Sequence, residues 1–282
     1  MQPYLNLKQL DAFLENALRE DMGTGDITTL STIEPDARAH GRYIAKESGV
    51  VCGLEVAKRV FELLGGDVGF TACVNEGDEV AVGDVIAEVS GNAVELLTGE
   101  RVGLNIMQRL SGVATRTKEA VDAVAGTGAK ICDTRKTTPG MRVLEKYAVR
   151  VGGGTNHRFN LADGVLIKDN HIVAAGSITA AVERARAVIP HTLKIEVETE
   201  TLDQVREALD AHADIIMLDN MNLEQMREAV TLINKRALTE ASGNMGERDL
   251  RAVAECGVDL ISIGALTHSV KSLDISLKFK LV

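Results

Sequence analysis

Residues 193–220, LKIEVETETLDQVREALDAHADIIMLDN, hold two short apolar runs separated by an amphipathic stretch. The runs are Leu193–Val197 and Asp214–Leu218, and Leu202–Ala211 between them has apolar residues at helical spacing. Strand, helix and strand in this order are typical of a right-handed βαβ crossover, which places both strands parallel in one sheet. The stretch therefore predicts a parallel α/β fold.

The same alternation of apolar run and amphipathic stretch extends in both directions from about residue 130 onward. Five or six such units in succession favour a barrel over a short open sheet, which periodicity alone leaves as an alternative. The apolar runs are Ala129–Cys132, Val165–Ile167, Leu193–Val197, Asp214–Leu218, Ala237–Thr239 and Val258–Ile263. The amphipathic stretches are Ile178–Ile189, Leu202–Ala211, Leu223–Ile233 and Glu247–Cys256.

The first part of the chain has a different pattern. A helix is predicted from Leu7 to Leu18, and Arg38–Ala45 and Phe70–Val89 alternate apolar and polar residues as strands do. A long helical stretch, Val94–Val124, follows them. Three glycines interrupt it, and because glycine costs about 1 kcal/mol in a helix, they indicate close contact with another domain or subunit: Gly99, Gly103 and Gly112.

Composition excludes several classes of protein. The net charge of −10 argues against binding to nucleic acid or to an anionic membrane. Four widely spaced cysteines form no C-x-x-C pair, so we expect reduced thiols and neither a zinc site nor a disulfide framework. The start, MQPYLNLK, resembles no signal peptide, and no apolar run approaches the roughly 20 residues of a membrane span. The expected location is cytoplasmic.

Polar residues follow consecutive predicted strands at the points where the strands end. Because the carboxyl ends of the strands carry the active site in parallel barrels, these residues predict one shared site. Glu196 and Glu198 lie two apart, on the same face of their strand. The strand-end groups are Lys168–His171, Glu196 with Glu198, Asp219–Asn220, Ser242–Asn244 and Gly264–Ala265.

Two features indicate that this site binds anions. Gly243 and Gly264 each precede a predicted helix and let backbone N–H groups approach a phosphate closely. Between Asp133 and His171, seven Lys or Arg outnumber four Asp or Glu, 7 − 4 = +3, within a chain of net charge −10. Arginine suits bidentate binding of carboxylate and phosphate. We expect Lys146 and Arg150, unlike the rest, on a solvated surface.

Cations beside carboxylates suit phosphoribosyl transfer, which needs a neutralised pyrophosphate and stabilised positive charge at the ribose carbon. Carboxylates could also hold Mg²⁺ together with substrate phosphates. The chain has no zinc-protease spacing and no G-x-S-x-G nucleophile elbow.

At this point the motifs identify a family. The chain resembles quinolinate phosphoribosyltransferase over nearly its whole length, with the motifs in the same order. They are DTRKTTPGMR (133–142), KYAV (146–149), GGGTNHR (152–158), IKDNH (167–171), EVE (196–198), IMLDN (216–220), EASGN (240–244) and ISIGALT (261–267), with EDMGTGDITT (20–29), LTGER (97–101) and LNIMQRLSGVAT (104–115) before them.

The resemblance implies that quinolinate and 5-phosphoribosyl-1-pyrophosphate become nicotinate mononucleotide, pyrophosphate and CO2 in NAD biosynthesis. It implies catalytic roles for Lys136, Lys168, Glu198 and Asp219. The quinolinate carboxylates would contact Arg101 from the partner subunit, Arg135, His157, Arg158 and Lys168. Phosphoribosyl pyrophosphate would contact Lys136, Glu198, Asp219, Ser242, Gly243, Asn244, Ser262, Ile263 and Gly264. Glu198 and Asp219 would hold Mg²⁺, directly or through water.

The family fold implied for the chain is an N-terminal α/β sandwich followed by an incomplete, TIM-like α/β barrel, assembled as a dimer or larger. We place the boundary at about Thr115, giving Met1 to about Thr115 and 116–282, with the C-terminal tail packing back on the first domain. Three alternatives remain: an enzyme for another carboxylated heterocycle, a lyase with Lys168 as Schiff-base nucleophile, and a relative that has lost its chemistry.

Overall fold

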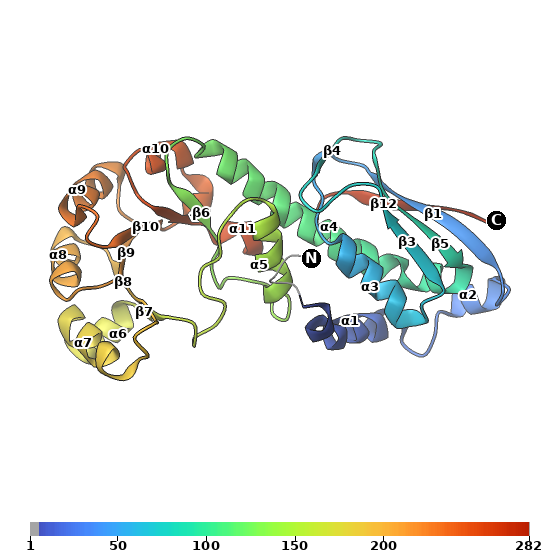
Figure 1. Ribbon diagram of the computed structural model, residues 1–282, viewed down its shortest axis with the longest axis horizontal. Helices are drawn as coiled ribbons and strands as arrows, with labels where there is room; N and C mark the ends of the chain where they lie inside the picture. The colour runs from blue at the N-terminus through green and yellow to red at the C-terminus, as the bar shows by residue number, and fades with distance from the viewer. Residues whose placement is uncertain (1–5, 282) are drawn as a thin grey trace. The chain divides into compact units, whose positions relative to one another are not determined.

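The computed structural model describes residues 6–281, which form two compact units. The first unit combines three segments, Met1–Lys118, Pro139–Gly153 and Val270–Val282, and the second combines Glu119–Thr138 and Gly154–Ser269 (Figure 1). The expectation that no signal peptide is present depends partly on residues 1–5, which lie outside the described residues.

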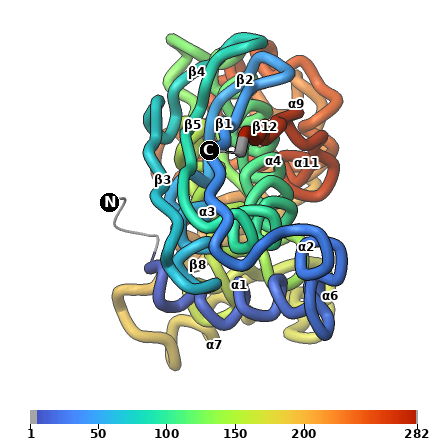
Figure 2. The backbone as a smooth tube through the Cα atoms, turned by 90° about the vertical axis from the view of Figure 1, so that its right-hand side faces the viewer, coloured from blue at the N-terminus to red at the C-terminus, as the bar shows by residue number. Residues whose placement is uncertain are grey.

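An antiparallel sheet of four strands forms the centre of the first unit, in the order β12-β1-β5-β3. Strand β1 lies between β5 and β12 (Figure 2) and pairs with both. In the pairing with β12, Tyr43 lies opposite Leu277. The alternating burial along β1 matches the alternation in its sequence. The strands are β1 (Arg38–Ala45), β3 (Val68–Ala72), β5 (Val85–Asn92) and β12 (Ile275–Leu281), with the short pair β2 (Gly49–Val50) and β4 (Glu79–Val80).

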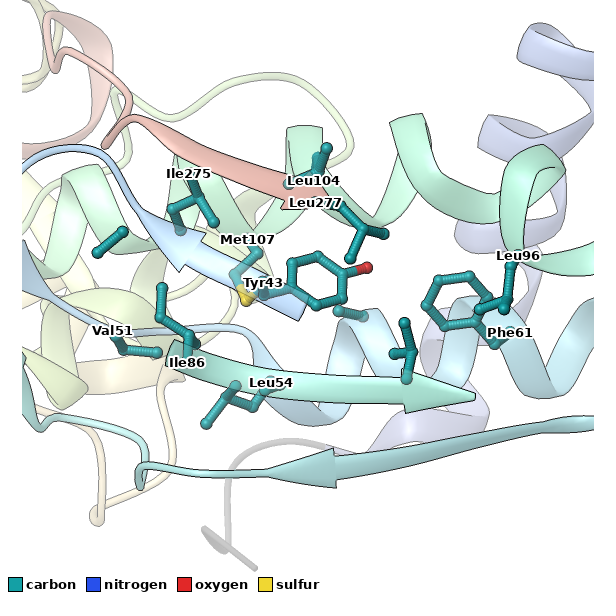
Figure 3. Packing of buried hydrophobic residues seen from close by; sticks show 14 of the residues in the cluster. Tyr43, Val51, Leu54, Phe61, Ile86, Leu96, Leu104, Met107, Ile275 and Leu277 are labelled. Atoms are coloured by element: carbon teal, nitrogen blue, oxygen red, sulfur yellow. The ribbon is translucent and has the colours of Figure 1, made fainter. Parts of the chain in front are cut away.

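Helices supply the rest of the core of the first unit. Tyr43 and Ile86 from the sheet are buried together with Phe61 from α3 and Met107 from α4 (Figure 3). A sheet with helices packed against it is the predicted α/β sandwich, and that prediction is confirmed. The helices are α1 (Leu7–Met22), α2 (Ile27–Thr32), α3 (Leu54–Leu64), α4 (Ala93–Ala123) and α5 (Arg142–Val151).

The glycines of α4 are explained by contacts inside the first unit. A Cβ on Gly99 would lie 2.9 Å from the Phe61 ring, and one on Gly112 would meet the backbone of Lys271 and Ser272. The prediction of close packing is therefore confirmed. The neighbours are elements of the same unit, whereas we had expected another domain or subunit.

The second unit is built on six parallel strands in the order β6-β11-β10-β9-β8-β7. Among the described residues the two edge strands, β6 and β7, do not pair with each other, so the barrel stays open there. The predicted incomplete barrel is confirmed. The strands are β6 (Lys130–Cys132), β7 (Val165–Ile167), β8 (Ile195–Thr199), β9 (Ile215–Asp219), β10 (Leu238–Ser242) and β11 (Leu260–Ser262).

Capping residues fix where the helices after these strands begin. Thr201 and Asn222 each accept a backbone N–H, and a glutamine three residues on, Gln204 or Gln225, bonds back to the cap. The stretch predicted as helical from Glu247 begins only after the cap Asp249. The helices are α6 (Asp169–Ala175), α7 (Ile178–Val188), α8 (Leu202–Asp210), α9 (Leu223–Ile233), α10 (Leu250–Ala254) and α11 (Ala265–His268), with the 3₁₀ turn η1 (Met245–Glu247).

No helix within residues 6–281 combines the length and the apolar character that crossing a membrane requires.

Candidate active site

A cavity of about 630 Å³ lies within the second unit, at the carboxyl ends of its parallel strands. Twelve of the site residues that the family resemblance implies line it: Arg135, Lys136, His157, Arg158, Lys168, Glu198, Asp219, Ser242, Gly243, Asn244, Ser262 and Gly264. The strand-end residues Asn220 and Ala265 line it as well. The strand-end rule for parallel barrels accounts for their convergence.

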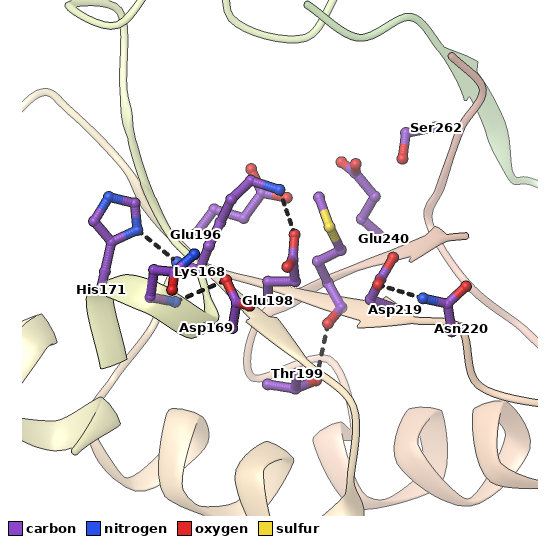
Figure 4. Close-up of polar contacts among 12 residues, drawn as sticks. Lys168, Asp169, His171, Glu196, Glu198, Thr199, Asp219, Asn220, Glu240 and Ser262 are labelled. Carbon is purple, nitrogen blue, oxygen red and sulfur yellow. Dashed lines mark hydrogen bonds and ion pairs between the residues drawn. The ribbon is translucent and has the colours of Figure 1, made fainter. Parts of the chain in front are cut away.

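The register of the strands arranges the lining in layers. Met217 of β9 pairs with Glu198 of β8 on one side and with Glu240 of β10 on the other. Two residues further along, Asp219 pairs with Ser242 and forms the next layer toward the strand ends. Residues two apart face the same side of a strand, and Figure 4 shows Glu198, Glu240 and Asp219 on one side of the sheet.

Lys168 and Glu198 form an ion pair across two neighbouring strand ends. Lys168 Nζ donates to Glu198 Oε2 over 2.5 Å (Figure 4). Lys168 also precedes α6, where its backbone N–H donates to His171 Nδ1. His171 therefore fixes the start of α6 and is not among the lining residues.

A buried carboxylate, Asp133, brings the two arginines of the cavity together. It accepts hydrogen bonds from Asn156 Nδ2 and from the backbone N–H of His157, at 2.6 and 2.9 Å. It directly follows β6, and two residues later the chain reaches Arg135. The segment that carries His157 and Arg158 is thereby held beside the segment that carries Arg135.

The two guanidinium groups repel each other. Burial lowers the pKa of Arg158, the charge of Arg135 lowers it further, and Glu196 and Asp163 act in the opposite direction. Arg158 Nη1 donates to the carbonyl of Gly164, whereas its buried Nε has no hydrogen-bond partner among the described residues. Two cations that repel each other, one of them with an unpartnered Nε, are suited to receive an anion.

The loop after β10 depends on a glycine. Gly243 has φ +95°, and a Cβ there would lie 2.8 Å from the backbone nitrogen of Asn220. Asn220 also has a positive φ, and its Nδ2 donates to Asp219 Oδ2 over 2.7 Å. One asparagine thus contacts both the acidic residue of β9 and the glycine loop of β10.

The loop after β11 is held against Lys136. Thr267 Oγ1 donates to the carbonyl of Lys136, and a Cβ on Gly264 would lie 3.0 Å from the Lys136 side chain. The helices expected after Gly243 and Gly264 are single turns, η1 and α11. The backbone N–H groups of the loops, more than helix dipoles, are therefore the donors available to an anion.

Several predicted residues lie elsewhere. Ile263 is buried and is not a lining residue, and Arg101 is exposed on α4 in the first unit. Three cations of the basic segment lie on α5, also in the first unit: Arg142, Lys146 and Arg150. The expectation that Lys146 is solvated is wrong, because α5 buries residues 144–149.

Eight lining residues were not predicted as site residues: Thr134, Leu166, Met217, Glu240, Met245, Gly246, Glu247 and His268. Glu240 and Met217 each lie two positions before a predicted residue on the same strand, so strand periodicity could have identified them. His268 lies in α11, and its ring would contact a Cβ placed on Gly264. A single histidine at the end of a short helix gave no signal in the sequence.

Comparison with known proteins gives a consistent result. Residues 26–111 match the family model "Quinolinate phosphoribosyl transferase, N-terminal domain", and residues 113–278 match the corresponding C-terminal domain. The chain is 50% identical over 273 residues to the "Probable nicotinate-nucleotide pyrophosphorylase [carboxylating]" of Bacillus subtilis, covering 97% of this chain and 94% of that protein. It is 44% identical to a chloroplastic protein of the same name from Arabidopsis thaliana, covering 95% of this chain and 82% of that one.

The fold of the chain is also similar to solved structures of the same family. The crystal structure of NadC from Streptococcus pyogenes superimposes with a TM-score of 0.93 at 45% identity, covering 99% of both chains. The nicotinate-nucleotide pyrophosphorylase from Francisella tularensis superimposes with a TM-score of 0.92 at 37% identity, covering 98% of both.

Proposed function

The chain belongs to the quinolinate phosphoribosyltransferase family, and we propose that the cavity of its second unit is where a phosphoribosyl group is transferred to quinolinate. The enzyme acts in NAD biosynthesis and converts quinolinate and phosphoribosyl pyrophosphate to nicotinate mononucleotide, pyrophosphate and CO2. The observation that carries this assignment is the pair of mutually repelling guanidinium groups, Arg135 and Arg158, in a cavity that also has carboxylates and a glycine loop.

The arginine pair is the proposed site for the two carboxylates of quinolinate. A dianion placed between Arg135 and Arg158 removes their repulsion and uses the unpartnered Arg158 Nε. We assign His157 and Lys168 to the same substrate. His157 would act through ring contact and packing, since both of its nitrogens already face protein partners.

The loops after β10 and β11 are the proposed site for the 5′-phosphate. Gly243 and Gly264 leave room at the backbone, and Lys136 adds a compact positive charge beside Gly264. Ile263, although buried, contributes its backbone in this proposal. The residues assigned to the phosphoribosyl group are Ser242, Gly243, Asn244, Ser262, Ile263 and Gly264, with Lys136 near the pyrophosphate.

Glu198 and Asp219 are the proposed ligands of the ribose hydroxyls and of Mg²⁺. Both present carboxylate oxygens to the cavity, the donor type that Mg²⁺ prefers, and the ion commonly uses one or two carboxylates together with substrate phosphates. When bound, Mg²⁺ would neutralise the pyrophosphate leaving group. Glu198 must then exchange its ion pair with Lys168 for a new partner.

The chemistry requires no protein nucleophile. The pyridine nitrogen attacks the ribose carbon as pyrophosphate leaves, and the carboxylates of Glu198 and Asp219 stabilise the positive charge that develops on the sugar. The positively charged ring then accepts the electron pair released when the adjacent carboxylate leaves as CO2. Lys168 Nζ is already bound to Glu198 Oε2, which argues against its use as a Schiff-base nucleophile.

We also propose an assembly of at least two copies. Arg101 is exposed on α4, which is consistent with donation to the quinolinate site of a second copy. The domain division at about Thr115 and a cytoplasmic location are retained as proposals, the latter supported by four free cysteines.

The test is to incubate the purified protein with quinolinate, phosphoribosyl pyrophosphate and Mg²⁺ and to measure pyrophosphate, CO2 and nicotinate mononucleotide together. Equal amounts of the three products are expected. A folded protein that releases none of them, and also leaves nicotinate unreacted, would overturn the assignment. If another pyridine or imidazole carboxylate reacted instead, only the choice of heterocycle would be wrong.

A further inference from the structure

Three buried side chains meet at the inner end of the cavity. His157 Nε2 lies 3.0 Å from Glu196 Oε2 and 3.8 Å from Glu240 Oε1. Glu196 and Glu240 are only 3% and 1% exposed, yet Glu240 is a lining residue of the cavity. None of the roles proposed above explains why two carboxyl groups are buried together here.

The cluster has the composition of a metal site, because one possible ligand atom from each residue lies within 4.8 Å of the others. The orientation of His157 argues against this use. The backbone N–H of Arg158 donates to His157 Nδ1 over 2.8 Å, so Nδ1 carries no proton. A neutral imidazole must then carry its proton on Nε2, where it points at Glu196 and leaves no lone pair for a metal. The three side chains are therefore arranged to share hydrogen bonds and protons, and not to bind a metal ion.

Glu240 is the residue of the cluster that favours its protonated form. Burial raises the pKa of Glu240 to about 7, and the neighbouring carboxylates of Glu196 and Asp133 act in the same direction. His157 and Ser262 lower this pKa, but by less than burial and Glu196 raise it. These groups come from β8, from β11 and from the segments after β6. Glu240 Oε1 has no hydrogen-bond partner among the described residues.

The proposed reaction consumes one proton at the ring carbon that loses CO2. When CO2 leaves, the bond between the ring carbon and the carboxylate breaks and its electron pair remains on that carbon. The product carries hydrogen there, so one proton must be delivered to the carbon. The carboxylates of quinolinate are expected beside Arg158, whose charge interacts with Glu196, the immediate neighbour of Glu240.

We propose that Glu240, a buried carboxyl group at the inner end of the cavity whose Oε1 has no hydrogen-bond partner among the described residues, delivers this proton to the ring carbon as CO2 departs. The proposal rests on the function proposed above. The O–H bond of Glu240 breaks, the proton joins the carbon, and Glu240 becomes a carboxylate that regains a proton from solvent when product leaves. In its neutral form Glu240 also does not repel the incoming dianion, as a carboxylate in that position would.

In the cluster of His157, Glu196 and Glu240, we assign Glu196 the role of a positioning residue. By accepting the Nε2 proton of His157 it fixes the ring, and its negative charge keeps the proton on Glu240. Its replacement is therefore expected to shift the pH dependence of decarboxylation. Replacement of Glu240 is expected to remove the proton source itself.

The experiment compares the wild type with Glu240→Gln, which keeps the shape of the side chain and removes the acid. Reactions are stopped in acid at early times, and pyrophosphate, CO2 and undecarboxylated quinolinate mononucleotide are measured. The wild type should release pyrophosphate and CO2 in equal amounts. Glu240→Gln should release CO2 about 100-fold more slowly than pyrophosphate, with quinolinate mononucleotide accounting for the difference.

Asp259→Asn is the matched control. Asp259 accepts hydrogen bonds from Thr239, the residue before Glu240, but it lies outside the cavity. The Asp259→Asn variant should leave the ratio of CO2 to pyrophosphate unchanged. Should Glu240→Gln fail to fold, Glu240→Asp, with an acid one methylene shorter, should show the same imbalance to a smaller degree.

The outcomes separate this inference from the proposed function. If the wild type gives no CO2 from quinolinate, the proposed function fails. If the wild type reacts while the Glu240 variants release pyrophosphate and CO2 in equal amounts, whether at reduced or unchanged rate, Glu240 is a structural residue and only the proton-delivery proposal is overturned.

Discussion

Asn220 and Gly243 occupy neighbouring strand ends so closely that the space for a Cβ at Gly243 is taken by the Asn220 side chain and by its backbone nitrogen, 2.8 Å away. The same asparagine donates to Asp219. A change at the glycine loop is therefore transmitted to the acidic residue proposed to hold the ribose and Mg²⁺.

Gly243→Ala should impair use of phosphoribosyl pyrophosphate. The new methyl group displaces Asn220, and the backbone must leave φ +95°. The strain of about 1–3 kcal/mol predicts a KM for phosphoribosyl pyrophosphate raised about 5- to 150-fold, with a smaller change in KM for quinolinate. Gly69→Ala, in β3 of the first unit, is the control, since a Cβ there meets only Ser90, at an ordinary contact distance of 3.5 Å. Equal kinetics for the two variants would contradict the role of the loop.

Arg158→Lys should weaken quinolinate binding while keeping the charge. Lysine cannot form the bidentate contact of a guanidinium, and the loss of about 1.5–3 kcal/mol raises KM for quinolinate about 10- to 100-fold. Initial rates at saturating phosphoribosyl pyrophosphate measure the effect. Arg184→Lys, an exposed arginine on α7, provides the comparison and should behave as wild type. If Arg158→Lys left the KM for quinolinate unchanged, the assignment of a quinolinate carboxylate to Arg158 would be wrong.

Gly112→Ala should destabilise the protein, although helix propensity alone predicts a gain of about 1 kcal/mol. The methyl group would meet the backbone of Lys271 and lie 3.0 Å from Ser272 Cα, and a backbone neighbour cannot rotate away. We expect a net loss of about 2 kcal/mol in unfolding free energy, measured by denaturant titration. Asn105→Ala, at an exposed position of the same helix, should instead be neutral or slightly stabilising.

Tyr43→Phe should stabilise the first unit. The Tyr43 hydroxyl is buried without a hydrogen-bond partner among the described residues, and burial raises its pKa. Removing an unsatisfied hydroxyl relieves a desolvation cost of about 1 kcal/mol. A thermal melt should show a higher Tm for the variant. A lower Tm would reveal that the hydroxyl is satisfied in solution.

Glu240 should make stability fall as pH rises from about 5 to about 7. Because burial raises the pKa of Glu240 from its ordinary value of 4.5 to about 7 in the folded protein, the folded state binds more protons than the unfolded state in this window. The favourable contribution of Glu240 to the unfolding free energy is complete below its pKa in the unfolded state. It is lost as the pH approaches its pKa in the folded state, by at most roughly 3 kcal/mol. Unfolding free energies of wild type and Glu240→Gln, measured against pH, should therefore diverge. A constant difference would refute the shifted pKa.

The sequence predicted the second unit well because its signals are local. Each strand ends close to the predicted residue, and the period of two along β8 correctly placed Glu196 and Glu198 on one face. The convergence of Lys168, Asp219 and Ser242 followed from a general rule about parallel barrels.

What the sequence could not supply was the neighbourhood of each side chain in three dimensions. Strand periodicity could have identified Glu240 as a residue facing the site, but its burial beside Glu196 depends on the register between β8, β9 and β10. The burial of Lys146 likewise depends on packing around α5. The pairing of β12 with β1 joins segments too distant for any local pattern to indicate.

That pairing has a consequence for biosynthesis. As the chain leaves the ribosome, β1 emerges early, whereas its partner β12, which places Leu277 opposite Tyr43, emerges only after the whole second unit. Until then one edge of the first sheet offers unpaired N–H and C=O groups to other chains, the condition that favours aggregation. Folding is therefore expected to finish after synthesis, and shielding of the open edge by chaperones should raise the yield of active enzyme.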